Sequence, residues 1–176
     1  LDSQQKTEKT VKENKFKDEL ITFEIKKNDK IETFKKDEYP RENLSIEKLK
    51  SLKTIFKDNG TVTAGNSSGL NDGAAVLVLM SREEAELRSI EPLVKIISWA
   101  TCGVEPSLMG LGPIPATNLA LKKAGWQISH VDLFEIHATV APLSIAVIKD
   151  LNIAKEIVNI DGSEIALGHQ IGASEA

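Results

Sequence analysis

Apolar residues in the later two-thirds of the chain gather into short runs, separated by polar or glycine-containing segments. Four of these runs have the length of a buried strand: residues 74–80, 93–100, 131–136 and 157–160. Helices are expected between them at residues 82–88 after Ser81 as N-cap, at 116–124 before Gly125 as C-cap, and at about 142–151. Strands that alternate with helices predict an α/β fold with a layered core and buried strands.

The first 58 residues have a different pattern, rich in lysine and poor in glycine. They predict a helix at 3–20, an alternating strand at 21–25 and a polar hairpin at 27–36. A second helix is expected at 45–56, where apolar residues recur at helical spacing. At the other end of the chain, "IDGSEIALGHQIGASEA" predicts a strand at 165–167, then a tight turn that carries His169, and then a helix start.

The composition of the chain limits the classes of protein to which it can belong. With 176 residues and 41% hydrophobic content, the chain can bury one ordinary core, or one domain with an appended piece. No apolar run is long enough to span a bilayer and no targeting signal is visible, so we expect a soluble, cytoplasmic protein without a membrane partner. The single cysteine, Cys102, excludes an internal disulfide, a CxxC redox pair and a thiolate zinc cage.

Charge gives no sign of a nucleic-acid partner. The formal net charge is −4, and the lysine-rich residues 1–58 hold 15 Lys or Arg beside 13 Asp or Glu. Interspersed charges of both signs are typical of a solvated surface. We therefore expect no nucleic-acid binding.

Three stretches carry a specific resemblance: "NGTVTAGNSSGLNDGAAVLVLMS" (59–81), "GVEPSLMGLGPIPATNLALKKAGW" (103–126) and the closing stretch (160–176). Together they resemble the thiolase family, most closely its biosynthetic acetyl-CoA C-acetyltransferases. The resemblance runs from residue 3 to residue 176 and covers a middle-to-late portion of the family subunit. It implies a partial thiolase fold: residues 1–69 as the loop domain covering the CoA site, 70–92 as the tail of the N-terminal thiolase domain, and 93–176 as a truncated C-terminal thiolase domain.

The resemblance also implies two catalytic histidines. His169 lies where the family has the histidine of its GHP motif, which activates the nucleophilic cysteine and helps hold the acyl carbonyl oxygen. A histidine that titrates near neutrality can take a thiol proton and donate to an oxyanion. The alternative is a turn histidine satisfied by backbone groups. His137, in "EIHATVAP", stands where biosynthetic members have an asparagine that polarises the carbonyl through a water.

Several residues depart from the family pattern at this site. Ala138 replaces a glutamate, Val140 a phenylalanine of the pantetheine tunnel, and Gln170 the proline of the GHP motif. Ser163, Glu164 and Glu175 stand where the family has Gly, Ala and Gly. A glutamate in a close-packed segment must find a partner or water. These departures predict an eroded acyl site.

The positions that match the family's CoA contacts depart less from the family pattern than the acyl site does. Arg41 matches an arginine near the nucleotide end of CoA, where a guanidinium can pair with phosphate or stack on adenine. Ser68 matches the serine that hydrogen-bonds the pantetheine arm, and Phe56, Ala64 and Met109 match apolar wall positions. The alternative for each is a surface arginine or ordinary packing. The substrate implied is a coenzyme A thioester, with no further cofactor and no metal.

Neither family cysteine is expected within these residues, and Cys102 aligns with a structural strand end, where we expect an inert small residue. Thiolase chemistry needs a thiolate to carry the acyl group. One hypothesis is therefore an acetyl-CoA C-acetyltransferase fragment for acyl transfer between acyl-CoA thioesters, inactive alone. The other is a non-catalytic CoA-binding or thiolase-pairing module from a degraded or split gene. Expected partners are acyl-CoA and either a second copy or a complementary thiolase chain.

Overall fold

A computed structural model describes residues 1–174, so Glu175 lies outside the described residues. Its helices are α1 (Asp2–Lys12), α2 (Ile46–Lys50), α3 (Arg82–Leu87), α4 (Pro113–Ala124), α5 (Ala141–Asp150) and α6 (Glu164–Leu167). Its strands are β1 (Phe23–Lys27), β2 (Lys30–Phe34), β3 (Leu70–Asn71) and β4 (His169–Gln170). Four short 3-10 turns complete the elements: η1 (Lys15–Asp18), η2 (Pro106–Leu111), η3 (Ile128–His130) and η4 (Lys155–Ile157).

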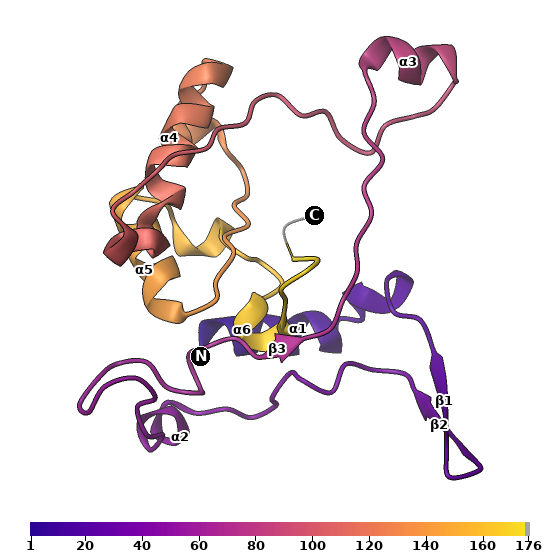
Figure 1. Ribbon diagram of the computed structural model, residues 1–176, viewed down its shortest axis with the longest axis vertical. Coiled ribbons are helices and arrows are strands. Elements are labelled where there is room, and N and C mark those ends of the chain that lie inside the picture. The colour runs from indigo at the N-terminus through magenta and orange to yellow at the C-terminus, as the bar shows by residue number, and fades with distance from the viewer. Residues whose placement is uncertain (175–176) are drawn as a thin grey trace.

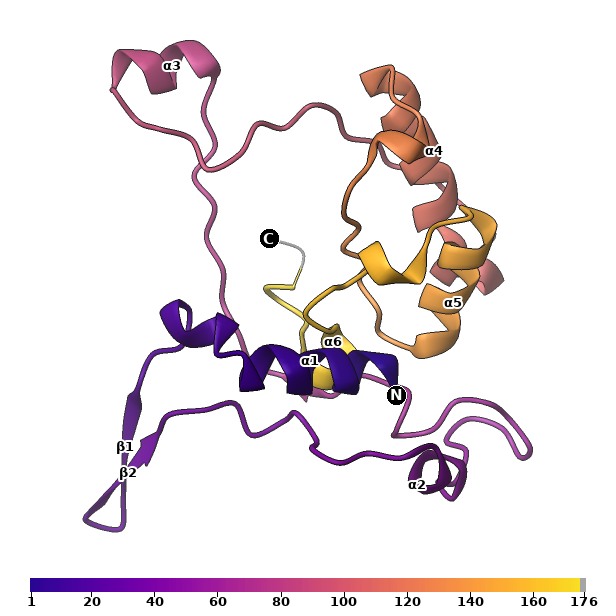
Figure 2. The same cartoon turned by 180° about the vertical axis from the view of Figure 1, so that it is seen from behind.

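The elements are arranged around an open frame (Figure 1). Helices α1 and α6 lie side by side along the base, α4 and α5 stand together on one flank, and α3 sits at the far end of a long extended arm. The β1–β2 hairpin projects from the base, with Phe23 opposite Phe34 in antiparallel register. From behind, α1 crosses the base in front of α6 (Figure 2).

The apolar core lies around α5. Its buried members come from α5, from the loop after it and from two segments beside it: Ile136, Val147, Leu151, Ile153 and Val158. A single parallel bridge, Phe134 with Val158, joins the two extended segments of this core. The buried Asn159 amide strengthens that bridge, because it accepts from the Ile136 N–H (2.7 Å) and donates to the Ile136 carbonyl (2.8 Å). The core is thus built on one flank of the frame.

Helix α1 buries a polar face. Gln4, Thr7 and Thr10, at three-residue spacing, are buried against the segment that leads into α6. The Thr7 hydroxyl donates to the Asp161 carbonyl (3.0 Å) and the Thr10 hydroxyl to the Asp161 carboxylate (2.6 Å). The Gln4 amide donates to the Ile165 carbonyl (3.2 Å). The first and last parts of the chain are therefore held together by hydrogen bonds.

Several predicted elements are confirmed. Ser81 caps α3 by accepting the Glu84 N–H (3.2 Å), and Gly125 ends α4 in the left-handed conformation (φ 70°). The hairpin and α5 also form close to the predicted residues. Pro113 starts α4 three residues before the predicted position, which suits a proline in the first turn of a helix.

Other predictions are wrong. The predicted helix at 3–20 ends at Lys12 because Asn14 takes a left-handed conformation (φ 57°), and the predicted helix at 45–56 ends at Lys50. Residues 165–167 belong to α6 and are not a strand. Residues 131–136 and 157–160 contribute one bridge and no full strand.

The largest difference concerns residues 74–80 and 93–100, the predicted buried strands. Both run as extended chain in the arm, and within residues 1–174 no strand pairs with them. Val76 is 88% exposed and Leu93 is 101% exposed. An extended segment becomes a strand only when a neighbour completes its hydrogen bonds, so the layered core is only partly formed. Within the same residues, no helix is long and apolar enough to cross a membrane.

The contact between α1 and Gly162 gives a stability prediction. Gly162 has φ +106°, and an added Cβ would lie 1.8 Å from the Thr7 hydroxyl oxygen. Gly162→Ala should destabilise the fold by roughly 1–3 kcal/mol from backbone strain alone, with the clash in addition. Urea unfolding followed by circular dichroism measures this change. Gly103→Ala is the matched control, because nothing lies within 4 Å of its added Cβ. Equal stability of the two variants would contradict the proposed contact.

The exposed arm gives a prediction about association. Unpaired extended segments with apolar side chains favour pairing with another chain, so the isolated 176-residue chain should elute from size-exclusion chromatography as an associated species. Val76→Lys with Val78→Lys should shift it toward the monomer, whereas Gln5→Lys with Thr61→Lys, at exposed positions outside the arm, should not. A monomeric wild-type chain that unfolds cooperatively would count against this prediction.

Candidate functional site

A loop at residues 66–71 ties two distant segments of the chain together. On one side, the Ser68 N–H donates to the Thr139 carbonyl (2.8 Å) and the Ala141 N–H donates to the Asn66 carbonyl (2.8 Å). The Asn66 side chain also holds the loop in shape, since its oxygen accepts the Thr63 N–H (2.8 Å). The loop therefore fixes the residues that lead into α5.

The same loop continues into β3, which pairs in parallel with β4. Leu70 lies opposite His169, and the His169 N–H donates to the Gly69 carbonyl (2.9 Å). Gly168 allows this close approach, because it has φ +92° and an added Cβ would lie 2.2 Å from the Asn71 side-chain oxygen. The loop thus brings the residues before α5 and the residues of β4 to one place.

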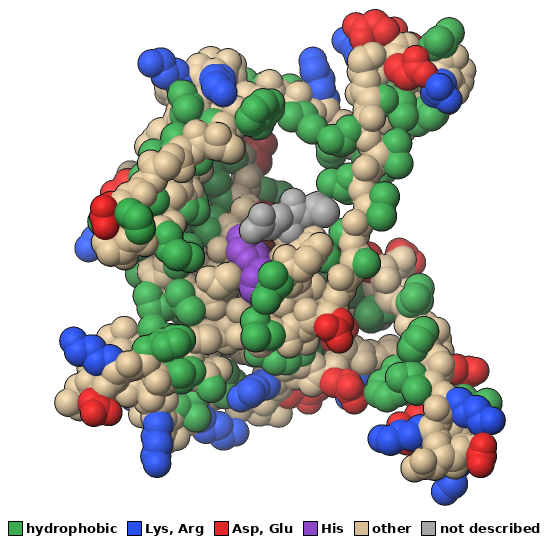
Figure 3. Space-filling view, viewed as in Figure 1, with side chains coloured by type: hydrophobic (Ala, Val, Ile, Leu, Met, Phe, Trp, Pro, Cys, Tyr) green, Lys and Arg blue, Asp and Glu red, His purple; other side chains and the backbone are tan. Residues whose placement is uncertain are grey.

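His137 and His169 meet at this place. Their ring centroids lie 4.4 Å apart, with an angle of 62° between the ring planes. Both side chains are half-buried. In the space-filling view, histidine side chains lie near the centre of one face of the molecule (Figure 3). The structure therefore brings together the two residues that the sequence marks as catalytic.

His137 has a carboxylate partner. Its Nδ1 lies 3.0 Å from one oxygen of Glu164, and the other oxygen of Glu164 accepts the Ala138 N–H (2.7 Å). The Nε2 atom of His137 is buried without a hydrogen-bond partner among the described residues. Sequence reasoning missed this pairing, although it marked Glu164 as a residue that needs a partner.

His169 is held by its own strand and turn. Its Nδ1 lies 3.1 Å from the Ser174 hydroxyl, and that hydroxyl donates to the Gln170 carbonyl (3.0 Å). With the hydroxyl proton on Gln170, the hydroxyl accepts from Nδ1–H of His169. This arrangement leaves Nε2 of His169 as the acceptor of the neutral ring.

Negative charge gathers near the two histidines. Partial burial raises the pKa of the Glu135 carboxyl, and the charges of Asp161 and Glu164 raise it further. Lys6 opposes this shift, and its ammonium group also donates to the Val158 carbonyl (2.7 Å). Lys15 also pairs with Asp161 (3.4 Å), so part of this negative charge is compensated.

A hollow of about 190 Å³ lies between α1, α2 and α6. Arg41 and Ala64, two of the predicted CoA contacts, line it together with Lys48 and Tyr39. The Arg41 backbone N–H donates to the Gln4 side chain (2.8 Å), so α1 fixes this part of the wall. Sequence reasoning did not name Lys48 as a contact, although its place in the predicted second helix was a usable signal.

The other predicted CoA contacts lie outside this hollow. Ser68 lies in the loop that joins the histidine segments, with its backbone N–H bound to Thr139. Phe56 is 81% exposed and Met109 is 79% exposed, and neither lines the hollow. Of the predicted apolar wall positions, only Ala64 therefore lines the hollow.

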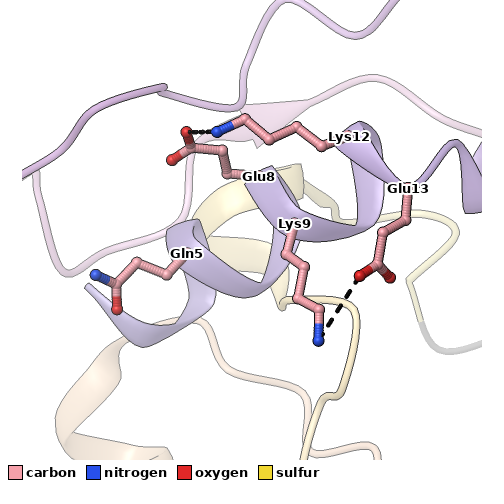
Figure 4. A pocket seen from close by; sticks show the side chains of 5 residues that line it. All are labelled: Gln5, Glu8, Lys9, Lys12 and Glu13. Carbon is pink, nitrogen blue, oxygen red and sulfur yellow. Dashed lines mark hydrogen bonds and ion pairs between the residues drawn. The ribbon is translucent and has the colours of Figure 1, made fainter.

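The outer face of α1 is an open surface and not an enclosed cavity (Figure 4). Its charged side chains pair along the helix, with Glu8 and Lys12 2.6 Å apart and Lys9 and Glu13 3.8 Å apart. The hydrogen bond from Lys12 lowers the pKa of the Glu8 carboxyl. These pairs have the four-residue spacing of a solvated helix surface.

Cys102 lies in the arm between α3 and η2, partly exposed. Among residues 1–174, no hydrogen bond joins it to a histidine. The same residues contain no group of three or more His, Cys, Asp or Glu arranged to hold a metal ion. The inert role of Cys102 stays a prediction.

Comparison with known proteins identifies the family. Residues 1–83 match the family model described as "Thiolase, N-terminal domain", and residues 90–176 match "Thiolase, C-terminal domain". The chain is 49% identical to an acetyl-CoA acetyltransferase of Shinella zoogloeoides over 99% of its own length and 44% of that protein. The chain thus spans less than half the length of this relative.

Solved structures give the same result. The crystal structure of the Bacillus anthracis acetyl-CoA acetyltransferase matches with a TM-score of 0.90 and 43% identity, over 98% of this chain and 44% of that one. Human mitochondrial 3-ketoacyl-CoA thiolase in complex with CoA matches with a TM-score of 0.89 and 38% identity, over 98% of this chain and 43% of that one. The chain has a partial thiolase fold of mixed α/β type and belongs to the thiolase family.

Proposed function

We propose that the chain is part of an acetyl-CoA C-acetyltransferase, acts in acyl transfer between acyl-CoA thioesters, and is inactive as an isolated polypeptide of 176 residues. The observation that carries the proposal is the meeting of His137 and His169, with ring centroids 4.4 Å apart, in a chain of the thiolase family. The 49% identity to an acetyl-CoA acetyltransferase supports this reaction.

His169 suits the role of general base. Its Nδ1–H is committed to Ser174, so its Nε2 can take the proton of a thiol within hydrogen-bond reach. The chain holds one cysteine, Cys102, in the arm between α3 and η2. We therefore propose that the nucleophile comes from thiolase residues outside this sequence, on the same polypeptide or on a complementary chain.

Coenzyme A thioesters are the proposed ligands, and no further cofactor is required. The hollow beside α1 offers the guanidinium of Arg41 and the ammonium of Lys48, which suit phosphate groups. The human thiolase structure in complex with CoA supports this ligand class. In this proposal residues 1–69 cover the CoA site, residues 70–92 end the N-terminal thiolase domain and residues 93–176 form a truncated C-terminal domain. The cytoplasm is the proposed compartment.

The second candidate function is a non-catalytic module that pairs with a thiolase subunit. The exposed apolar arm favours it, because residues 76–79 are each at least 65% exposed and extended. Pairing and CoA binding are compatible with either function. Turnover after mixing with a cysteine-bearing thiolase chain would separate the two.

A binding experiment tests the proposed CoA site. Arg41→Ala should weaken CoA binding about tenfold or more, because a charge-assisted hydrogen bond contributes about 1.5–3 kcal/mol. His169→Ala should bind CoA with nearly wild-type affinity, since it lies at the acyl end of the site. Isothermal titration calorimetry measures both, with Lys9→Ala on the solvated face of α1 as the matched control. Equal affinities for wild type and Arg41→Ala would contradict the site.

An activity experiment tests the proposal that the isolated chain is inactive. The purified chain alone should not consume acetoacetyl-CoA, because a histidine without a neighbouring thiol has no nucleophile to activate. Direct acylation of a histidine would still lack the backbone donors of the cysteine segments, and each such donor contributes about 100- to 1,000-fold in rate. Acetoacetyl-CoA loss is followed spectrophotometrically, with His169→Ala and Cys102→Ala in parallel. Turnover that Cys102→Ala abolishes would overturn the inert assignment of that cysteine.

A further inference from the structure

The Glu164 carboxylate contacts two consecutive residues of the candidate site. One oxygen lies 3.0 Å from Nδ1 of His137, and the other accepts the N–H of Ala138 at 2.7 Å. We propose that Glu164 is a positioning residue that fixes His137 in the tautomer with the proton on Nδ1. In that tautomer the free Nε2 of His137 is a hydrogen-bond acceptor beside the His169 ring.

The carboxylate sets the tautomer because an ionised carboxylate only accepts hydrogen bonds. Its second oxygen is used by Ala138, so the first oxygen remains for the imidazole. A neutral ring with its proton on Nε2 would place a lone pair of Nδ1 against that oxygen, and the two would repel. With the proton on Nδ1, the same contact is a charge-assisted hydrogen bond.

The position of Glu164 is itself fixed. It is the first residue of α6, whose N-cap Ser163 donates its backbone N–H to the Ser3 hydroxyl (2.9 Å). The carbonyl of the next residue, Ile165, accepts from the Gln4 side chain. Helix α1 therefore holds the start of α6, and with it the carboxylate, in place against His137.

This tautomer reverses the polarity of position 137. An asparagine amide there can donate to a carbonyl oxygen, whereas Nε2 of neutral His137 accepts and is buried without a partner among the described residues. A donor such as a thiol or hydroxyl would reach Nε2 only if the atoms that now cover it moved aside. When such a donor gives up its proton, the S–H or O–H bond breaks, the N–H bond forms on Nε2, and the Glu164 carboxylate stabilises the imidazolium.

The pairing also links two departures that look independent along the sequence. By its resemblance to the thiolases, the chain loses a glutamate at Ala138 and gains one at Glu164. The structure places the gained carboxylate on the backbone N–H of Ala138 itself. At position 138 the chain therefore has a carboxylate bound to its backbone N–H, contributed by α6.

Nitrogen chemical shifts of ¹⁵N-labelled histidine test the tautomer directly. Solid-state NMR is suitable, because it tolerates association of the chain, at about pH 8, above the ordinary histidine pKa of about 6.5. The wild-type chain should show His137 protonated on Nδ1. In Glu164→Gln, the amide oxygen can keep the Ala138 N–H while the amide NH₂ faces Nδ1, so the His137 proton should move to Nε2. Glu164→Ala should lose the Nδ1 preference.

His130 is an internal control in the same spectra. Its Nδ1 accepts the Gln127 N–H at 3.2 Å, so its proton should sit on Nε2 in every variant. Glu156→Gln, an exposed carboxylate in η4, is the matched control substitution and should leave His137 unchanged.

The wild-type spectrum decides the proposal even where a variant fails to fold. A wild-type His137 protonated on Nε2 would overturn it, as would an unchanged Nδ1 proton in both Glu164 variants. The catalytic meaning of the tautomer rests on the proposed function, but the measurement uses no CoA and no turnover. Failure of CoA binding would contradict the proposed function and leave the tautomer assignment standing.

Discussion

The arrangement of the candidate site depends on the docking of α1 against the segment at residues 158–165. That contact is polar: Thr7 and Thr10 bind Asp161, Gln4 binds Ile165, and Lys6 binds the Val158 carbonyl. Gly162 makes it possible, because a side chain there would occupy the place of the Thr7 hydroxyl. Each buried backbone group in this segment needs a partner, and α1 provides it with side chains. Helix α1 thus helps to fix the start of α6, while Ala138 and His137 hold the Glu164 carboxylate from the other side.

Local sequence signals predicted α3, α4 and α5 close to their observed positions, but not the ends of α1 and α2. Ser81 caps α3, Gly125 ends α4 and the α5 helix begins near Pro142, because capping and turn geometry depend on a few neighbouring residues. The helical character of 164–167 was missed, since the three-residue apolar run at 165–167 does not distinguish strand from helix. The buried polar face of α1 could not be predicted from the sequence, because Gln4, Thr7 and Thr10 are residue types typical of a solvated surface.

Strands were predicted less well for a different physical reason. A helix satisfies its own backbone, whereas residues 74–80 and 93–100 need neighbouring strands to become part of a sheet. Apolar content alone predicted burial for both segments, yet Val76 and Leu93 are exposed. The sequence therefore indicated which segments can form the sheet but not whether a neighbour is present. The candidate site was only partly predictable for a similar reason. His137 and His169 were predicted from motifs, whereas the contact of Glu164 with His137 depends on the three-dimensional path of the chain.

The hydrogen bonds of the two histidines limit what the chain can contribute to catalysis. Glu164 engages Nδ1 of His137 and Ser174 engages Nδ1 of His169, so each neutral ring has only its Nε2 free, as an acceptor. Two adjacent acceptors can receive protons, but neither can act as a nucleophile with the leaving-group properties of a thiolate. A neutral acceptor can stabilise a developing oxyanion only after it has taken a proton, because an oxyanion requires donors. If the site serves acyl transfer as proposed, it therefore needs a thiol that these hydrogen bonds do not supply, and the proton of that thiol would convert one Nε2 from acceptor to donor.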